Sequence, residues 1–342
     1  MNQIVNLWGL HMGGHVGETP IEQNFVAIGW GEIGDPKLLD GTRERFKQAM
    51  RETYPEKKSG AIPVDAGTLF KFIHEIKAGD YVVYPSKSDR MINIGQFTGT
   101  LAFVAEDMME YPNHRGVTWL AQFPRSDFSQ SALNEIGSFL TLFRVRTNAE
   151  EFLAKVGGGG VLQPALSTPS ADEPEDDDSA TLTVSRQAQD STEDFIIKRL
   201  MGLMTGYQFE EFVAHILECM GYHARVTQKS GDGGVDVIAH RDELGFEPPI
   251  IKVQCKRTTS KHGAPEINQL LGILGEGEFG LFVTLGAFSP AAKERERSIP
   301  KLRLIDGETF VGLIAENYAK IAPRYRALVP LKQILVPDLP ET

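Results

Sequence analysis

Cysteine is nearly absent from this chain of 342 residues, which has only Cys219 and Cys255. Two cysteines exclude a disulfide framework and a Cys-rich zinc site. The chain also lacks a run of about 18 apolar residues, the length that a transmembrane helix needs. Its first residues, MNQIVNLWGLHMGGH, have neither the basic start nor the continuous apolar stretch of a secretion signal. We therefore expect a cytoplasmic protein with no membrane partner.

Positive charge is scarce overall, and the formal net charge is −11 at pH 7. More than half of this excess lies in residues 157–192, which hold seven acidic residues against one base, Arg186. Local basic surfaces that bind a polyanion can therefore exist on either side of that segment. With 41% hydrophobic and 24% charged residues, the composition is that of a globular protein. The length suits two domains.

Residues 157–192 separate two regions of different pattern. Four consecutive glycines, three prolines and an acidic run make this segment unable to bury much apolar area, so we expect a flexible acidic linker. The acidic run is either a solvating spacer or a mimic of nucleic acid that covers a basic cleft. We place an N-terminal domain at 1–156, a C-terminal domain at 193–325 and a tail at 326–342.

The N-terminal region alternates short β-like runs with two helical patterns. The predicted strands are NFVAIGWGEI, AGDYVVYP, INIGQFTGTLAFV and GVTWLAQF, and the predicted helices are GTRERFKQAMRETY and DAGTLFKFIHEI. Short strands rich in glycine predict an α+β domain with a small curved sheet or barrel and helices at its rim.

The C-terminal region has an α/β pattern. A first helix is expected at STEDFIIKRLMGLM with Ser191 or Thr192 as its N-cap, and a second at YQFEEFVAHILECMGY, which Gly221 ends. The strands VDVIA, IIKVQCK, FGLFVTL and LRLID then alternate with helices at PEINQLLGIL, 289–297 and ETFVGLIAENY. We expect a central mixed sheet flanked by helices.

An acid, an amide and an amine fall on two neighbouring strands of this region. Asp236 follows the turn-rich SGDGG, and Gln254 and Lys256 share one face of IIKVQCK because strand side chains alternate. A hairpin would bring Asp236 beside Gln254. The Asp236 carboxylate, the Gln254 carbonyl and the backbone carbonyl of Cys255 would form an all-oxygen set that suits Mg²⁺, with Mn²⁺ as a substitute.

Such a set predicts metal-dependent phosphodiester hydrolysis. The metal would neutralise charge on a phosphate and lower the pKa of a bound water. Lys256 could orient or deprotonate that water and stabilise the transition state. Glu210, on the polar side of the second helix, could add an outer-sphere or second-metal contact. Taken singly, Asp236 is equally well explained as a turn residue, and Gln254 with Lys256, like Glu210, is better explained as solvent-facing. The hypothesis therefore depends on their combination.

The motifs of about residues 200–318 resemble the Mrr-type catalytic domain of the PD-(D/E)xK nuclease superfamily. They are FEEFVAHILECMGY, GDGGVDVIA, IKVQCKR and LIDGETFVGLI. The resemblance implies a Mg²⁺-dependent endodeoxyribonuclease, with double-stranded DNA as its partner and a catalytic set of Glu210, Asp236, Gln254 and Lys256. Gln254 stands where most of the superfamily has an acid, which should weaken metal affinity. Arg257 and Lys261 could contact the DNA backbone, whereas Ser289 and Pro290 suit a helix start.

The N-terminal region is similar to the PUA-like group that includes EVE and YTH domains. The similarity lies in IVNLWGLHMGG, NFVAIGWGEIGD, IKAGDYVVYP and HRGVTWL. It implies the recognition of a modified or flipped base, which needs ring stacking and hydrogen bonds to the base edge. The stacking candidates are Trp8, Trp30, Tyr84 and Trp119, with Trp30 first, and Asp35 could accept from a base amine. Core packing is the alternative for each tryptophan.

Together these patterns predict a modification-dependent (type IV-like) restriction endonuclease that cuts foreign DNA in antiviral defence. Cutting both strands needs two active sites, so we expect a homodimer or a higher assembly on DNA. One alternative is a defence effector nuclease that a small nucleotide or a partner protein activates through the N-terminal domain. Another is a structure-selective nuclease of the resolvase type.

Overall fold

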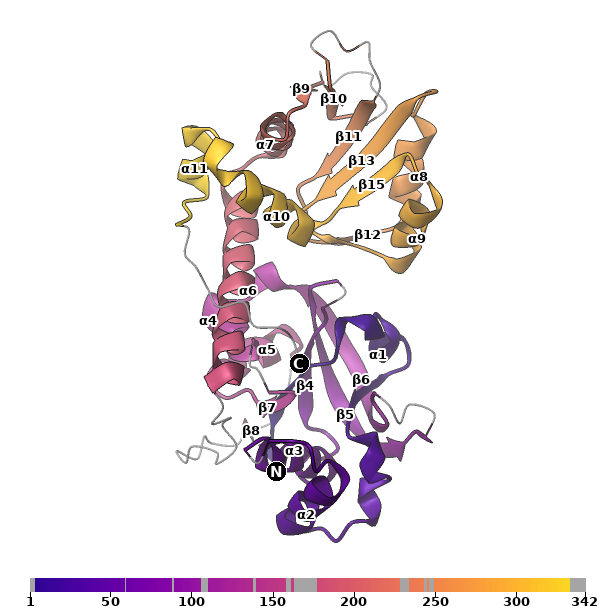
Figure 1. Cartoon of the computed structure of the whole chain (residues 1–342), viewed down its shortest axis with the longest axis vertical. Coiled ribbons are helices and arrows are strands. Elements are labelled where there is room, and N and C mark those ends of the chain that lie inside the picture. The colour runs from indigo at the N-terminus through magenta and orange to yellow at the C-terminus, as the bar shows by residue number, and fades with distance from the viewer. Residues whose placement is uncertain are drawn as a thin grey trace. The chain divides into compact units, whose positions relative to one another are not determined.

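The computed structural model describes residues 4–332 except 59, 88, 106–109, 138–139, 158–160, 163–176, 228–233, 243–244 and 246–248. The chain divides into two compact units, residues 1–191 with 336–342 and residues 192–335. Each unit has its own sheet (Figure 1) and its own hydrophobic clusters. None of the helices in the described ranges combines the length and apolar character needed to cross a membrane.

The first unit is built on a six-stranded open sheet that ends at β3 and β7. Only β2 and β4 are parallel neighbours. The four runs that the sequence predicted as strands correspond to β3, β4, β5 and β6. In spatial order the strands are β3 (Phe25–Ile28), β6 (Asn113–Pro124), β5 (Met91–Phe103), β4 (Tyr81–Pro85), β2 (Leu7–Leu10) and β7 (Leu142–Arg144).

Helices cover both faces of this sheet, whereas the sequence predicted them at the rim. The neighbours Val82 and Val83 point to opposite faces of β4. Val82 packs in a cluster with Phe46 of α2, and Val83 packs in another with Phe152 of α5. The helices of this unit are α1 (Thr19–Glu22), α2 (Arg43–Thr53), α3 (Ala61–Phe70), α4 (Gln130–Ile136) and α5 (Ala149–Lys155), and β1 (Ile4–Val5) pairs with β8 (Val161–Leu162) outside the main sheet.

The segment predicted to be a flexible linker is helical in its second half. Helix α6 spans Asp177–Leu203, so it begins 14 residues before the predicted N-cap at Ser191. No proline or glycine interrupts residues 177–201, and Asp177 and Asp178 stand at the N-terminus, where acids favour a helix. Part of the acidic run, residues 171–176, lies outside the described residues.

The second unit has a five-stranded mixed sheet. Strands β9, β10 and β11 are antiparallel, and β11, β13 and β15 are parallel. The sequence predicted all of them except β9, an edge strand of four residues whose alternate side chains are exposed. In spatial order they are β15 (Leu302–Ile305), β13 (Glu278–Thr284), β11 (Ile250–Lys256), β10 (Val237–His240) and β9 (His223–Val226), and β12 (Lys261–His262) pairs with β14 (Ala287–Phe288).

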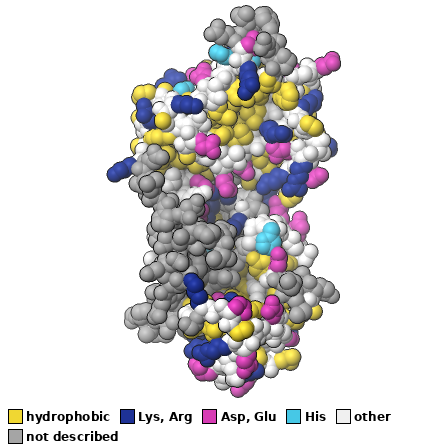
Figure 2. All heavy atoms as spheres, in the orientation of Figure 1, with side chains coloured by type: hydrophobic (Ala, Val, Ile, Leu, Met, Phe, Trp, Pro, Cys, Tyr) yellow, Lys and Arg dark blue, Asp and Glu magenta, His cyan; other side chains and the backbone are white. Residues whose placement is uncertain are grey.

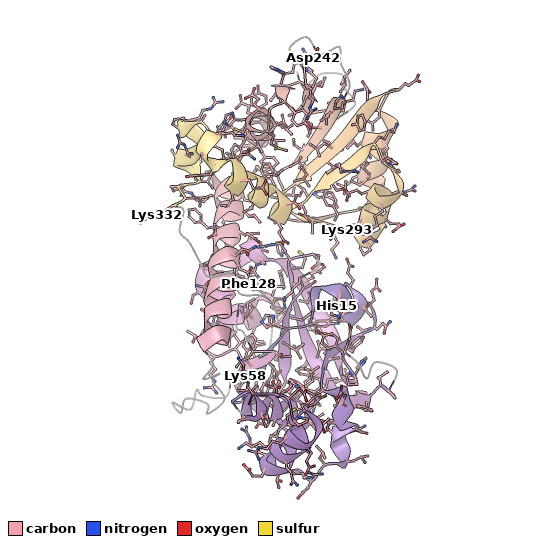
Figure 3. The ribbon with its side chains drawn as sticks, in the orientation of Figure 1. His15, Lys58, Phe128, Asp242, Lys293 and Lys332 are labelled. Atoms are coloured by element: carbon pink, nitrogen blue, oxygen red, sulfur yellow. The ribbon has the colours of Figure 1, made fainter. Side chains whose placement is uncertain are left out.

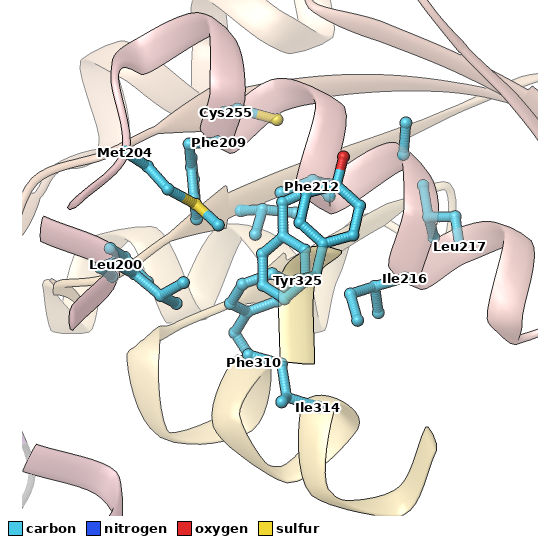
Figure 4. Packing of buried hydrophobic residues seen from close by; sticks show 14 of the residues in the cluster. Leu200, Met204, Phe209, Phe212, Ile216, Leu217, Cys255, Phe310, Ile314 and Tyr325 are labelled. Atoms are coloured by element: carbon cyan, nitrogen blue, oxygen red, sulfur yellow. The ribbon is translucent and has the colours of Figure 1, made fainter. Parts of the chain in front are cut away.

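Both faces of this sheet are also covered by helices. Val253 and Cys255 of β11 pack with Phe209, Phe212 and other residues of α6, α7, α10 and α11, as Figure 4 shows for part of the cluster. A second cluster joins α8 and α9 to Phe282 of the sheet. The helices are α7 (Gly206–Cys219), α8 (Ala264–Gly272), α9 (Pro290–Ser298), α10 (Gly307–Asn317) and α11 (Pro323–Leu328).

Two helix boundaries confirm predictions from the sequence. Gly221 follows α7 with a φ of 95°, a conformation that glycine adopts without strain. Ser289 is the N-cap of α9, accepting a hydrogen bond from Ala292 N, and Pro290 is the first helical residue. The segment predicted as a tail, residues 326–342, includes Val329, which is fully buried in the core of the second unit.

Candidate active site

Asp236 lies just before β10, next to β11, the strand that carries Gln254. Strand β10 pairs with β11 from Val237, which lies opposite Val253. Asp236 precedes this first pair, and its backbone N–H donates to the carbonyl of Val253 at 2.8 Å. This contact brings the acid next to the part of β11 that carries the amide.

The amide of Gln254 is held in an enclosed position. The side chain is only 8% exposed, and Oε1 is buried without a hydrogen-bond partner among the described residues. Gly234, with a φ of 95°, packs against the other end of the amide, and a Cβ there would lie 3.3 Å from Nε2. A buried oxygen without a hydrogen-bond partner is unfavourable unless a bound ligand interacts with it. The donor set at this position therefore fits a cation that prefers oxygen ligands.

The carboxylate of Asp236 faces the backbone of β11. Its Oδ2 accepts a hydrogen bond from the backbone N–H of Cys255 at 2.7 Å. Burial raises the pKa of Asp236, against the opposing effects of that hydrogen bond and of the Lys256 charge. The N–H and C=O of one strand residue point to the same side, so the Cys255 carbonyl is directed toward Asp236 too.

Lys256 and Glu210 bring two more charges to this end of the sheet. The half-buried Lys256 ends β11, and its positive charge acts on Asp236. Glu210 lies on α7, which Phe209, Phe212 and Val213 anchor against the sheet. Burial raises the pKa of the Cys255 thiol well above its ordinary value, and the negative charges of Asp236 and Glu210 add to the effect. Both acids therefore lie within electrostatic range of Cys255.

A metal at this position would depend on amide and carbonyl oxygens. In the part of the chain that the structure describes, no three His, Cys, Asp or Glu side chains gather as a metal-binding group. The set proposed from the sequence contains only two acids, Asp236 and Glu210, and completes its ligands with Gln254 and the Cys255 carbonyl. A set with few carboxylates is expected to bind a divalent ion weakly.

A buried histidine network next to Lys256 was missed in the sequence. His262, 5% exposed, contacts Thr258 Oγ1 through Nε2 at 3.0 Å and Glu266 Oε1 through Nδ1 at 2.8 Å. Burial acts to raise the pKa of Glu266, but hydrogen bonds from His262 and Gly263 and the charge of Lys256 outweigh it, so this pKa is lowered. The available signal was Glu266 three residues after Gly263, where its carboxylate accepts from the Gly263 N–H at the start of α8.

Of the two residues predicted to contact the DNA backbone, Arg257 also contacts the protein itself. Its Nη1 donates to the carbonyl of Met201, which lies in the last turn of α6. Its contact with a phosphate stays a prediction. Lys261, half-buried in β12, stays a prediction. The basic residues Lys293, labelled in Figure 3, Arg295 and Arg297 share α9 with Glu294 and Glu296.

The aromatic residues predicted to hold a base differ in burial. Trp8 and Tyr84 are each 1% exposed, and Trp8 Nε1 donates to the buried carboxylate of Asp80 at 3.1 Å. Neither ring has an open face for a base, so in this structure Trp8 belongs to the core and Tyr84 is at most a buried wall. Trp30 is half-buried at a φ of 65°, with Lys57 Nζ 5.9 Å from its ring centroid.

The remaining two candidates are Trp119 and Asp35. Trp119 is half-buried, and its Nε1 donates to the carbonyl of Pro20 at 3.0 Å. Asp35 is the N-cap of a 3₁₀ turn, where its carboxylate accepts from Lys37 N at 3.0 Å and pairs with Lys37 Nζ at 3.3 Å. These contacts give Asp35 a local structural role.

Comparison with known proteins assigns a class to the second unit. Residues 201–314 match the family Mrr_cat, described as a restriction endonuclease, and residues 8–146 match DUF8426, a domain of unknown function. The type IV methyl-directed restriction enzyme EcoKMrr of Escherichia coli (strain K12) is 29% identical over 217 residues, which are 61% of this chain and 68% of that protein. The second unit therefore contains an Mrr-type restriction endonuclease domain.

Two solved structures also match at low similarity. The DNA modification-dependent restriction endonuclease AspBHI is 16% identical with a TM-score of 0.32, over 96% of this chain and 95% of that chain. The restriction endonuclease MspJI, solved with a 27-mer oligonucleotide, is 14% identical with a TM-score of 0.32, over 77% of this chain and 66% of that chain. With TM-scores below 0.5, these likenesses carry no weight for this chain.

Proposed function

We propose that the chain is a modification-dependent DNA endonuclease, whose first unit reads a modified base and whose second unit hydrolyses phosphodiester bonds with Mg²⁺. The observation that carries the catalytic part is the buried Oε1 of Gln254, which lacks a hydrogen-bond partner among the described residues, next to the Cys255 N–H that the Asp236 carboxylate accepts from. The Mrr_cat match and the similarity to EcoKMrr support the substrate class.

Each side chain of the site has a role in this proposal. Asp236, Gln254 and the Cys255 carbonyl would hold the cation, and Glu210 would contact it through water or a second ion. When bound, Mg²⁺ supplies neutralising charge for the scissile phosphate and makes the attacking water more acidic. The Lys256 ammonium donates hydrogen bonds to the phosphate oxygens or orients the water through Nζ.

The base-recognition part assigns the first unit as a PUA-like module. Its support is the set of motifs shared with that group and the accessible edges of Trp30 and Trp119. A flipped base needs an aromatic face and polar groups at its edge. The strong acidity of the chain does not prevent DNA binding, because on the face shown in Figure 2 basic side chains stand among acidic ones on both units.

The first test of this function is cleavage. Full-length protein with Mg²⁺ is incubated with phage DNAs that carry different base modifications. We expect cleavage of at least one modified DNA, and a loss of about 10³-fold or more with Asp236→Asn or Lys256→Met, because each removes a group that acts on the transition state.

Lys252→Met is the matched control for Lys256. Lys252 lies on the same face of β11, but its Nζ pairs with Glu278 at 2.7 Å and donates to the carbonyl of Ile273, away from the proposed site. This variant should keep its cleavage rate. Equal losses with Lys252→Met and Lys256→Met, or full activity of Asp236→Asn, would contradict the catalytic assignment.

A further inference from the structure

A second polar group without a partner lies in the sheet of the first unit. On the face that holds Val82, the strand register places Tyr84 opposite Asn93 and Asn93 opposite Gln122. The next pair on this face is Gly95 opposite Trp119. Three strands therefore bring two aromatic rings and two amides together on neighbouring positions.

Gly95 explains why the Trp119 ring lies close to this group. A Cβ at position 95 would lie 2.8 Å from Trp119 Cε3 and 2.4 Å from Val117 Cγ1, so only glycine fits there. The Trp119 ring reaches across this position to Tyr84, with ring centroids 6.1 Å apart and an interplanar angle of 41°. Asn93 is the direct partner of Tyr84 and the diagonal neighbour of Trp119.

The amide of Asn93 is oriented by its surroundings. The side chain is 1% exposed, and Nδ2 donates to the carbonyl of Tyr84 at 3.2 Å. This bond fixes which end of the amide carries the oxygen. Oδ1 is buried with no hydrogen-bond partner among the described residues. An unpaired buried carbonyl is unfavourable, so its position favours a ligand that donates an N–H or O–H.

A carboxylate lies at the same group. Asp89 is 4% exposed, and it accepts from Met91 N through Oδ1 and from Gln122 Nε2 through Oδ2, each at 3.1 Å. Burial raises the pKa of Tyr84, and the charge of Asp89 raises it further, so the phenol stays protonated. Apart from the Tyr84 hydroxyl, the groups that this cluster presents to a ligand are the hydrogen-bond acceptors of Asp89 and Asn93. Such acceptors disfavour a base whose edge has only carbonyl oxygens.

We propose that Tyr84, Asp89, Asn93 and Trp119 form the site that receives the extruded base, and that this base carries an exocyclic amine that donates to Asn93 Oδ1. The inference rests on the proposed function and narrows it to modified cytosine or adenine. Trp119 supplies the stacking face, and Tyr84 forms the buried wall. This assignment replaces Trp30 as the main stacking residue.

Entry of the base requires Trp119 to move. Asn93 Oδ1 is closed to solvent in this structure. Trp119 is half-buried, packs against the cluster that contains Val82, and donates from Nε1 to the Pro20 carbonyl at 3.0 Å. When that bond opens, the ring can turn away from Gly95 and stack on the incoming base. The gain from stacking and from the new Asn93 bond offsets the lost bond.

Binding of defined duplexes by the full chain tests the inference. Fluorescence anisotropy is measured without divalent metal, so that no cleavage occurs, on duplexes that differ in one base. These carry 5-hydroxymethylcytosine, N6-methyladenine, 5-hydroxymethyluracil or no modification. We expect wild-type protein to prefer one of the two amine-bearing duplexes over both the uracil and the plain duplex. Asn93→Leu should lose about tenfold or more of the preference over the 5-hydroxymethyluracil duplex, which has a carbonyl oxygen in place of the exocyclic amine.

Asn113→Leu is the matched control. Asn113 is also 1% exposed and donates from Nδ2 to a backbone carbonyl, that of Gly29 next to Trp30. It should retain the preference if the base binds at Asn93 and lose it if the base binds at Trp30. Thermal unfolding of both variants verifies that they fold. Trp119→Ala, which changes a half-buried residue, provides a second readout and should lose the preference as well.

The outcomes separate the two levels of the proposal. A preference for the uracil duplex, or an unchanged preference in Asn93→Leu and Trp119→Ala, overturns this site and leaves modified-base recognition standing. A loss in Asn113→Leu equal to that in Asn93→Leu also overturns it. Equal binding of all four duplexes by the wild-type protein would contradict both the proposed site and the base-reading role of the first unit.

Discussion

Asp236 has features that suit a cation ligand and that destabilise the folded protein when no cation is bound. Burial makes its charged form less favourable, and neither the Cys255 N–H nor the Lys256 charge fully compensates. The unpaired Gln254 Oε1 adds a second unfavourable group next to it. Strained or poorly solvated groups of this kind are typical of functional positions. The stability of the chain should therefore respond to removal of this charge.

We predict that Asp236→Asn is at least as stable as the wild-type protein near pH 7 without metal. A folded-state pKa above the unfolded value means that the ionised carboxylate opposes folding at neutral pH. This penalty is relieved as the pH falls through the raised pKa. The advantage of the variant should thus shrink on acidification, as followed by thermal unfolding from about pH 7 to about pH 4. A wild-type protein that is the more stable at neutral pH and loses that advantage in acid would contradict the assigned environment.

The sequence grouped Asp236, Gln254 and Lys256 through strand alternation and one hairpin. The structure confirms the two strands, and the common site of these three residues stays a prediction. His262 and Glu266 were missed because the ends of a short strand and a capped helix bring them together. Trp8 was a stacking candidate in the sequence but is 1% exposed in the core, because a tryptophan in a strand has the same pattern whether its face is covered by helices or open to a ligand.

The turn before β10 shows how one backbone conformation positions the site. Gly234 has a φ of 95° and packs against the Gln254 amide. The glycines of this turn were recognisable in the sequence, but their contact with Gln254 depends on the pairing of β10 with β11. The start of helix α6 was mispredicted for a related reason: a glycine- and proline-rich stretch suggested a linker, although no proline or glycine interrupts residues 177–201.

We predict that Gly234→Ala loses both stability and activity. The positive φ costs about 1–2 kcal/mol for a residue with a Cβ, and the new methyl group would displace the Gln254 amide. Gly221→Ala is the matched control, because Gly221 has the same φ of 95° with no atom within 4 Å of its added Cβ. Both variants should unfold at lower temperature, but only Gly234→Ala should lose DNA cleavage. Equal cleavage rates would separate this turn from catalysis.

The molecule as a whole joins a restriction endonuclease domain to a unit that matches a domain of unknown function. The domain boundaries predicted from composition remain hypotheses. The two compact units of the structure divide between residues 191 and 192, inside α6. Composition could locate the change of pattern but not the helix that crosses it. Antiviral defence as the biological role, and the dimer on DNA, also remain proposals.

If two copies act together on one DNA, an inactive copy should trap a half-finished product. We predict that mixing wild-type protein with excess Asp236→Asn converts double-strand cleavage of a modified supercoiled plasmid into nicking. Gel analysis of the nicked and linear forms measures the effect. Linear product that falls only in proportion to the wild-type fraction, with no rise in nicked plasmid, would indicate that each copy cuts both strands alone.

Direct measurement of Mn²⁺ binding to the full chain tests the proposed metal site itself. Manganese is paramagnetic, so the free ion can be titrated by electron paramagnetic resonance in the absence of DNA. We predict one weak site in the wild-type protein, loss of that site in Asp236→Asn, weaker binding in Gln254→Leu and tighter binding in Gln254→Glu, where a carboxylate replaces the amide. Identical Mn²⁺ titrations for all four proteins would contradict the account.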